Sequence, residues 1–205
     1  SESSGENAIT IVPGAAGTIK NEDIDNFKDI FNDSNIFLTQ LETPIKTTLY
    51  ALKKAKDNGC ITILNPAPAT DIDQKLFSSI DFFTPNEIEA GYYLKKDLKS
   101  KSDIESAAKD FLDKGIKNII ITLGEKGLYF ANAQEKYFVD TFKLNNKVVD
   151  TTGAGDAFNG AFAFALANDY KFKYALEFAN KVAAISTTKL GAANSMPRLN
   201  EIEKY

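Results

Sequence analysis

The sequence predicts an α/β protein with three layers, in which helices cover both faces of a mainly parallel, Rossmann-like sheet. Short apolar runs alternate along the chain with longer segments whose apolar residues recur at helical spacing. Two of the runs, 60–64 and 118–123, are almost continuously apolar, which is typical of parallel strands buried on both faces. The last two runs flank a short turn, which predicts antiparallel strands at one edge.

The strand predictions rest on short apolar runs that end at residues unsuited to a regular strand. Pro13-Gly14 ends the first run, Asn65-Pro66 ends the third, and Gly124 ends the fifth. In chain order, the predicted strands are 8–12, 35–41, 60–64, 81–83, 118–123, 127–132 and 136–142. A further β-prone run ends just before Val149, and we treat it as one more strand end.

The helix predictions rest on apolar residues at helical spacing and on residues that suit helix ends. Asn21 suits an N-cap, Pro44 suits a first turn, and Asn58-Gly59 and Gly115 suit helix ends. In chain order, the predicted helices are 21–31, 44–58, 87–94, 102–114, 156–168, 172–188 and 199–204. Ligands of such sheets bind at the carboxyl ends of the strands, so the informative loops are those after Leu41, Leu64, Phe83, Leu123 and Val149.

Composition excludes several classes of protein. The hydrophobic share of 43% and charged share of 25% are those of a globular protein, and no apolar run is long enough to span a bilayer. A net charge of −4 argues against a nucleic-acid scaffold. The lone Cys60 and the absence of histidine exclude an internal disulfide and Ser-His catalysis. We therefore expect a cytoplasmic protein without membrane or nucleic-acid partners, whose proton acceptor, if it is an enzyme, is a carboxylate or a lysine.

The stretch 149–160 carries the strongest functional pattern. Two glycines, two threonines and two aspartates stand immediately before an apolar helical run, which begins at about Gly155. The N-terminus of such a helix favours an anion, commonly phosphate, and a carboxylate beside an anion site suggests a proton acceptor. An ordinary strand–loop–helix junction, with the aspartate as N-cap, is the alternative interpretation. The pattern is neither a Walker A motif nor a dinucleotide fingerprint, because Phe158 stands where the third glycine should be.

Residues 150–158, Asp-Thr-Thr-Gly-Ala-Gly-Asp-Ala-Phe, resemble the C-terminal signature of the ribokinase-like (PfkB) carbohydrate kinases. The resemblance implies a ribokinase-type fold. It implies that Gly153, Ala154 and Gly155 form an anion hole for the transferring phosphoryl group. It also implies that Asp156 contacts the sugar and acts as the base for its hydroxyl group, and that Gly155 and Asp156 border the nucleotide.

Two further segments resemble sugar-side elements of this family. Gln40-Leu41-Glu42 resembles the ribokinase segment whose glutamate touches the sugar, which implies a substrate contact by Glu42. The alternative is a surface residue that precedes a helix. Asn65-Pro66-Ala67-Pro68 resembles a stretch seen especially in ribokinases, although a rigid strand exit explains it equally well.

Three segments resemble nucleotide-side elements. In 84–90 the resemblance places Asn86 near the phosphates and implies that Glu89 orders Mg²⁺ through water; the alternative is a capped surface helix. Asn180 matches the position that lines the adenine slot; the alternative is a core residue. For the third segment the resemblance implies a nucleotide-binding loop, and the alternative is a simple β-turn. Its residues are Thr122, Leu123, Gly124, Glu125, Lys126 and Gly127.

The resemblance also implies a site for a monovalent cation, usually K⁺, beside the anion hole. The ion would hold the shape of that turn. Its oxygen ligands would come from the two ends of the C-terminal helical pair, namely from Asp150, Thr152, Ser186, Lys189, Gly191 and Ser195.

Taken together, the resemblance implies transfer of a phosphoryl group from ATP, with Mg²⁺ and K⁺, to the primary hydroxyl of D-ribose, giving D-ribose 5-phosphate. The alternative acceptors are fructose and a nucleoside, and the alternative to an enzyme is a non-catalytic nucleotide-binding module. Residues 1–205 match the C-terminal part of such a kinase domain, with 1–12 as a remnant of its lid strands, and the family's N-terminal sugar motif is not found. We therefore expect little kinase activity from these residues alone. The resemblance also allows the full-length protein to form a homodimer.

Overall fold

The computed structural model describes residues 12–145 and 147–205, and within these ranges its centre is a six-stranded sheet. The strands lie side by side in chain order, and β1 to β4 are parallel, whereas β5 and β6 are antiparallel to their neighbours. Their bounds are β1 (Ile36–Thr39), β2 (Ile61–Leu64), β3 (Phe82–Phe83), β4 (Asn118–Thr122), β5 (Leu128–Asn132) and β6 (Lys136–Val139). The predicted mainly parallel sheet with antiparallel edge strands is confirmed.

Eight α-helices accompany the sheet in the described ranges. They are α1 (Asn21–Asn26), α2 (Lys28–Asn32), α3 (Ile45–Asp57), α4 (Glu87–Leu94), α5 (Lys101–Asp113), α6 (Ala154–Ala167), α7 (Phe172–Ser186) and α8 (Leu199–Ile202). Short 3₁₀ turns are η1 (Gly14–Thr18), η2 (Gln74–Ser79), η3 (Gly124–Lys126) and η4 (Ala193–Ser195). Across the described part of the chain, no helix combines the length and apolar character needed to cross a bilayer.

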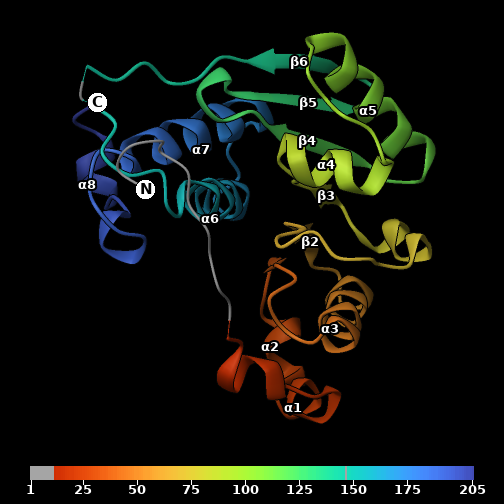
Figure 1. Cartoon of the computed structure of the whole chain (residues 1–205). Coiled ribbons are helices and arrows are strands. Elements are labelled where there is room, and N and C mark those ends of the chain that lie inside the picture. Colours follow the sequence, from red (N-terminus) through yellow and green to blue (C-terminus); the bar gives the residue numbers. More distant parts are fainter. Residues whose placement is uncertain (1–11, 146) are drawn as a thin grey trace.

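Helices cover both faces of the sheet (Figure 1), and a large hydrophobic core lies between the sheet and the helices on each face. Adjacent strand residues point to opposite faces: Leu64 and Phe83 pack with α3, α4 and α5, whereas Ile63 and Phe82 pack with α6 and α7. Each connection from β1 to β4 advances in the same direction, so right-handed crossovers put α3 to α5 on one face. The helices α6 and α7 then return to cover the other face, which is why the central strands are apolar on both sides.

Two predictions of local structure need correction, and a third falls almost entirely outside the described residues. The β-prone run before Val149 is not a strand; the Val149 N–H instead donates to the Thr187 carbonyl at 2.8 Å, and the chain from Asp140 to this point is irregular where it is described. The predicted helix 21–31 is interrupted at Phe27, which separates α1 from α2. The predicted strand 8–12 lies outside the described residues except for Val12, which is not in a strand.

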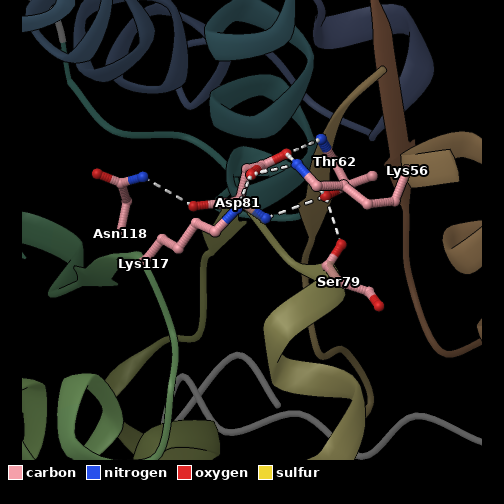
Figure 2. Close-up of polar contacts among 6 residues, drawn as sticks. All are labelled: Lys56, Thr62, Ser79, Asp81, Lys117 and Asn118. Carbon is pink, nitrogen blue, oxygen red and sulfur yellow. Dashed lines mark hydrogen bonds and ion pairs between the residues drawn. The ribbon is translucent and has the colours of Figure 1, made fainter. Parts of the chain in front are cut away.

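A polar cluster around Asp81 holds together the amino-terminal ends of β2, β3 and β4 (Figure 2). The Asp81 carboxylate accepts hydrogen bonds from Lys56 Nζ at 2.6 Å, from Lys117 Nζ at 3.1 Å and from the Thr62 N–H at 3.0 Å. The Asp81 carbonyl accepts from Asn118 Nδ2 at 2.9 Å. This cluster is at the sheet edge opposite to the carboxyl ends of the parallel strands, so it supports the fold and not the site.

Candidate active site

The predicted anion-binding turn forms the start of α6. Gly153 is its N-cap, with a φ of +78°, a left-handed conformation that favours glycine. No side chain caps this helix, and within the described residues no acceptor faces the amide N–H of Gly155 or of Asp156. Because unpaired first-turn amides and the helix dipole attract anions, the observed geometry fits a phosphoryl group.

Asp156 lies in the first turn of α6 and is exposed. Its Oδ1 accepts a hydrogen bond of 2.6 Å from Nε2 of Gln40, which directly follows β1. No partner for Oδ2 is found in the described part of the chain, so this oxygen is free to accept a proton. A carboxylate with one restrained and one free oxygen, next to unpaired amides at the carboxyl edge of the sheet, is suited to deprotonate an alcohol beside a phosphate.

Residues that the sequence analysis left without a role stand behind this pair. Asn65 and Thr84, which follow β2 and β3, and Asn159 of α6 are buried and hydrogen-bonded to one another or to the site. Asn65 and Thr84 belong to motifs that the sequence analysis quoted, but only as a strand exit and as a flanking residue. Their position after successive parallel strands is the signal that could have indicated a shared cluster.

Asn86, Glu89 and Thr122 come together at the next strand ends. Asn86 forms a parallel β-bridge with Thr122, and the Thr122 N–H donates to the Pro85 carbonyl at 3.0 Å. Asn86 Oδ1 caps α4 by accepting from the Glu89 N–H at 2.8 Å, and Glu89 Oε2 accepts from the Asn86 N–H at 2.8 Å. Burial raises the pKa of Glu89, although this hydrogen bond opposes the shift. The reciprocal cap named as the alternative interpretation is thus present, and the role of Glu89 toward Mg²⁺ stays a prediction.

The predicted nucleotide loop is the turn η3 between β4 and β5. Leu123 is buried, and its N–H donates to the Gly127 carbonyl at 2.8 Å, so Gly124, Glu125 and Lys126 protrude from the sheet edge. At Gly127 the φ is +86° and a Cβ atom would lie 2.0 Å from the Val139 carbonyl oxygen, so only glycine fits. The loop has the exposed backbone that a flat base or a phosphate requires.

The segments predicted to hold a monovalent cation are neighbours. Asp150 accepts from the Thr152 N–H and from the Gly191 N–H, each at 2.9 Å. A hydrogen bond from the Thr152 side chain, followed by these two N–H groups, lowers the pKa of Asp150. A Cβ atom on Gly153 would lie 3.3 Å from the Cβ of Ala192, so the loop after α7 packs against the anion-binding turn. Carboxylate, hydroxyl and carbonyl oxygens here suit a hard cation.

Of the other predicted ligands, Ser186 is the last residue of α7, and Lys189, Gly191 and Ser195 follow it in the loop that includes η4. Ser186 Oγ and Ser195 Oγ donate to the carbonyls of Ala183 and Ala192, each at 2.7 Å. Lys189 pairs with Glu201 at 2.9 Å. Nowhere in the described ranges do three His, Cys, Asp or Glu side chains gather as a metal site. The predicted cation site therefore depends on backbone carbonyls, hydroxyl oxygens and the Asp150 carboxylate, and it stays a prediction.

Two predicted residues are not joined to Asp156 by any hydrogen bond in the described residues. Glu42 is exposed on the bend after β1, two positions beyond Gln40. Asn180 is only 7% exposed, and its amide accepts from the Phe142 N–H at 3.0 Å and donates to the Asp140 carbonyl at 3.3 Å. Asn180 also lines a cleft of about 630 Å³ between the 139–143 segment, α7 and α8, and no residue of the anion-binding turn lines this cleft.

Comparison with known proteins gives a consistent result. A ribokinase of Staphylococcus aureus is 37% identical over 201 residues, which cover 98% of this chain and 66% of that protein. The ribokinase structure of Thermotoga maritima has a TM-score of 0.86 and 42% identity, over 98% of this chain and 65% of that one. The structure of the Arabidopsis thaliana ribokinase complexed with ribose and ATP has a TM-score of 0.88 and 30% identity, and the match covers 98% of this chain and 65% of that one.

The chain thus spans about 65% of the length of these relatives. Residues 1–199 match the family described as pfkB family carbohydrate kinase. With the fold, the anion-binding turn and the adjoining carboxylate in agreement, the chain belongs to the pfkB family of carbohydrate kinases.

Proposed function

We propose that this protein, in its full-length form, transfers the γ-phosphoryl group of ATP to the primary hydroxyl of a sugar, with D-ribose as the preferred acceptor and D-ribose 5-phosphate as the product. The observation that carries the proposal is the pairing of Asp156 with the uncapped first turn of α6. The chain's similarity to ribokinases, including one complexed with ribose and ATP, supports the choice of substrates.

In this reaction, Asp156 accepts the hydroxyl proton through Oδ2 as the new P–O bond to the sugar oxygen forms and the bond between the γ-phosphorus and the bridging oxygen breaks, releasing ADP. Proton removal of this kind is worth about 10²–10⁴ in rate. The amides of the Gly153–Gly155 turn donate to the oxygens of the migrating phosphoryl group. Loss of one comparable donor costs roughly 3–4 kcal/mol of barrier. Asp156 and these amides belong to the same helix turn, so base and anion hole act on one transition state.

The remaining roles belong to the same proposal. Glu42 accepts hydrogen bonds from sugar hydroxyls, and Asn180 borders the adenine. Asn86 and the loop from Thr122 to Gly127 bind the nucleotide. Glu89 holds a water ligand of Mg²⁺, which, when bound, neutralises charge on the phosphates. The oxygens around Asp150 hold a monovalent cation that fixes the anion-binding turn. A cytoplasmic location and a homodimer of the full-length protein remain predictions.

The test is ADP release by the full-length protein across a panel of ribose, fructose and nucleosides. In Asp156→Asn we expect kcat to fall by about 10²–10⁴, with ATP affinity kept, because the carboxamide cannot take up the proton. Asp169→Asn is the matched control: it makes the same chemical change just beyond the other end of α6, in a left-handed conformation that asparagine tolerates.

Near-normal turnover in Asp156→Asn would remove the proposed base. A full-length protein that binds ATP and turns over no acceptor of the panel would indicate a non-catalytic nucleotide-binding module instead. Residues 1–205 alone should show little activity, and robust ribose phosphorylation by them would contradict that expectation.

A further inference from the structure

A continuous chain of hydrogen bonds ties the base to three strand ends and back to its own helix. Gln40 Nε2 donates to Asp156 Oδ1 at 2.6 Å and to Asn65 Oδ1 at 3.0 Å. Asn65 Nδ2 donates to the Thr84 carbonyl at 2.9 Å, and Thr84 Oγ1 donates to Asn159 Oδ1 at 2.7 Å. Asn159 Nδ2 closes the ring by donating to the Gly155 carbonyl at 2.9 Å. We call these five side chains the amide ring.

The direction of every hydrogen bond in the amide ring follows from two backbone carbonyls, which can only accept. The Thr84 carbonyl requires the NH₂ of Asn65, so the Asn65 oxygen faces Gln40 and the NH₂ of Gln40 faces Asp156. The Gly155 carbonyl likewise requires the NH₂ of Asn159, so the Thr84 hydroxyl donates to the Asn159 oxygen. The other members of the amide ring therefore orient Gln40 so that its NH₂ group, and not its oxygen, faces Asp156.

The part of the ring behind Gln40 is closed off from solvent. Asn65 is 8% exposed, Thr84 is 1% exposed and Asn159 is 3% exposed. A buried polar group that loses its partner keeps its desolvation cost, so the amides do not exchange partners with water. This rigid interior fixes the first turn of α6 relative to the ends of β1, β2 and β3.

We propose that the amide ring is a positioning device for the base, with Gln40 as its positioning residue. Gln40 holds Oδ1 of Asp156 as an acceptor and so directs Oδ2 toward the acceptor alcohol, while Asn159 and Thr84 hold the helix turn that carries both Asp156 and the anion-binding amides. This inference rests on the proposed function, in which Asp156 is the base. Gln40 acts through Asp156, because its NH₂ is fully used by Asp156 and Asn65.

The experiment uses the full-length protein and two variants of nearly equal size. Gln40→Met removes the donor without adding charge, and Gln40→Glu replaces the donor by a second carboxylate facing Asp156. We expect kcat for ribose to fall by about tenfold in Gln40→Met and by about 100-fold in Gln40→Glu, because small misplacements of reacting groups have effects of this size. KM for ATP should stay within about twofold, since the nucleotide contacts are untouched.

Two controls separate positioning from loss of folding. Gln134→Glu makes the same chemical change in the turn between β5 and β6, outside the amide ring, and should leave kcat unchanged. At the buried end of the ring, Thr84→Ser keeps the hydroxyl donor and should keep kcat within about threefold, whereas Thr84→Val leaves Asn159 without its donor and should lower kcat by at least about tenfold.

Unchanged kcat in both Gln40 variants would overturn the inference. A change in the KM of these variants without a fall in kcat would also overturn it, as would an equal fall in kcat in Thr84→Ser and Thr84→Val. Its failure is distinct from failure of the proposed function. If the unsubstituted protein phosphorylates ribose and Asp156→Asn abolishes turnover while the Gln40 variants are normal, only the positioning role is wrong. If Asp156→Asn is fully active, the proposed base itself is wrong.

Discussion

Replacement of Asp81 by asparagine tests how the amino-terminal end of the sheet is held together. The Asp81 side chain is 14% exposed and is paired with Lys56 and Lys117, whose side chains are 30% and 52% exposed. Its carboxylate also accepts from the Thr62 N–H and Oγ–H (Figure 2). The asparagine keeps the shape of the side chain but turns one acceptor into a donor, which then faces donors.

The magnitude follows from these contacts. A hydrogen bond to a charged group contributes about 1.5–3 kcal/mol, whereas breaking a fully buried ion pair costs about 3–5 kcal/mol. The lysines are partly exposed, so water replaces part of what they lose, and we expect Asp81→Asn to lower the free energy of unfolding by about 2–3 kcal/mol. For a domain of this size, a loss of about 2–3 kcal/mol lowers the Tm by roughly 4–12 °C.

The pH dependence gives an independent check. Burial alone would raise the pKa of Asp81, but Lys56, the Thr62 N–H and Lys117 outweigh it and hold the pKa below its usual range. Because the folded-state pKa lies below the unfolded value of about 3.9, the stabilisation is present above that pH. It is lost as the pH falls further, through the folded-state pKa. The stability difference between the two proteins should therefore stay nearly constant from pH 7 to about pH 5, and it should shrink as the pH falls through the unfolded-state pKa and toward the folded-state pKa.

The assay is urea unfolding followed by circular dichroism. Asp97→Asn is the matched control, since Asp97 forms an exposed pair with Lys99 and should cost no more than about 0.5 kcal/mol. Equal midpoints for Asp81→Asn and Asp97→Asn at pH 7 would refute the calculation, as would a difference that does not change down to pH 3.

Two further predictions concern backbone conformation and thiol reactivity. Gly153→Ala places a Cβ in a left-handed conformation, 3.2 Å from Met196 Cε, so it should lower turnover and should lower the free energy of unfolding by about 1–2 kcal/mol. The control is Gly160→Ala, whose Cβ meets nothing within 4 Å and which should be neutral or stabilising. Equal urea midpoints for the two variants would contradict this prediction. Cys60 is 1% exposed, and burial raises the pKa of its thiol. A thiol reagent at pH 8 should therefore modify the native protein at least about tenfold more slowly than the protein unfolded in urea. Equal rates of modification would exclude a buried thiol.

The parts of the fold that sequence predicted well are those with local causes. The run Ile119-Ile120-Ile121 is apolar at every position because both faces of β4 are covered, and it was assigned correctly. The predicted helix 87–94 agrees with α4 because Asn86 and Glu89 form a reciprocal cap at its start and Lys95 adopts a left-handed conformation at its end. Such signals act over a few residues and can be read from one sequence.

What escaped prediction depends on contacts between distant segments. Gln40 and Asp156 are 116 positions apart, and no local pattern indicates that an amide after β1 restrains a carboxylate in α6. The segment before Val149 has strand-like composition, yet it does not pair with another strand. The Phe142 N–H donates to Asn180 of α7, and the Val149 N–H donates to the Thr187 carbonyl just after α7. The roles of Glu42, Asn180 and the cation ligands came from family resemblance, and they remain predictions.

The order of the strands also governs how this protein is assembled during synthesis. The six strands of the described residues all precede α6 and α7 in the chain. Before those two helices are synthesised, Ile63, Phe82, Ile120 and Phe130 lack the helices that cover them, and exposed apolar surface of this kind favours aggregation of incomplete chains. Because α6 also carries Asp156, the proposed base reaches its position only when this apolar face is covered.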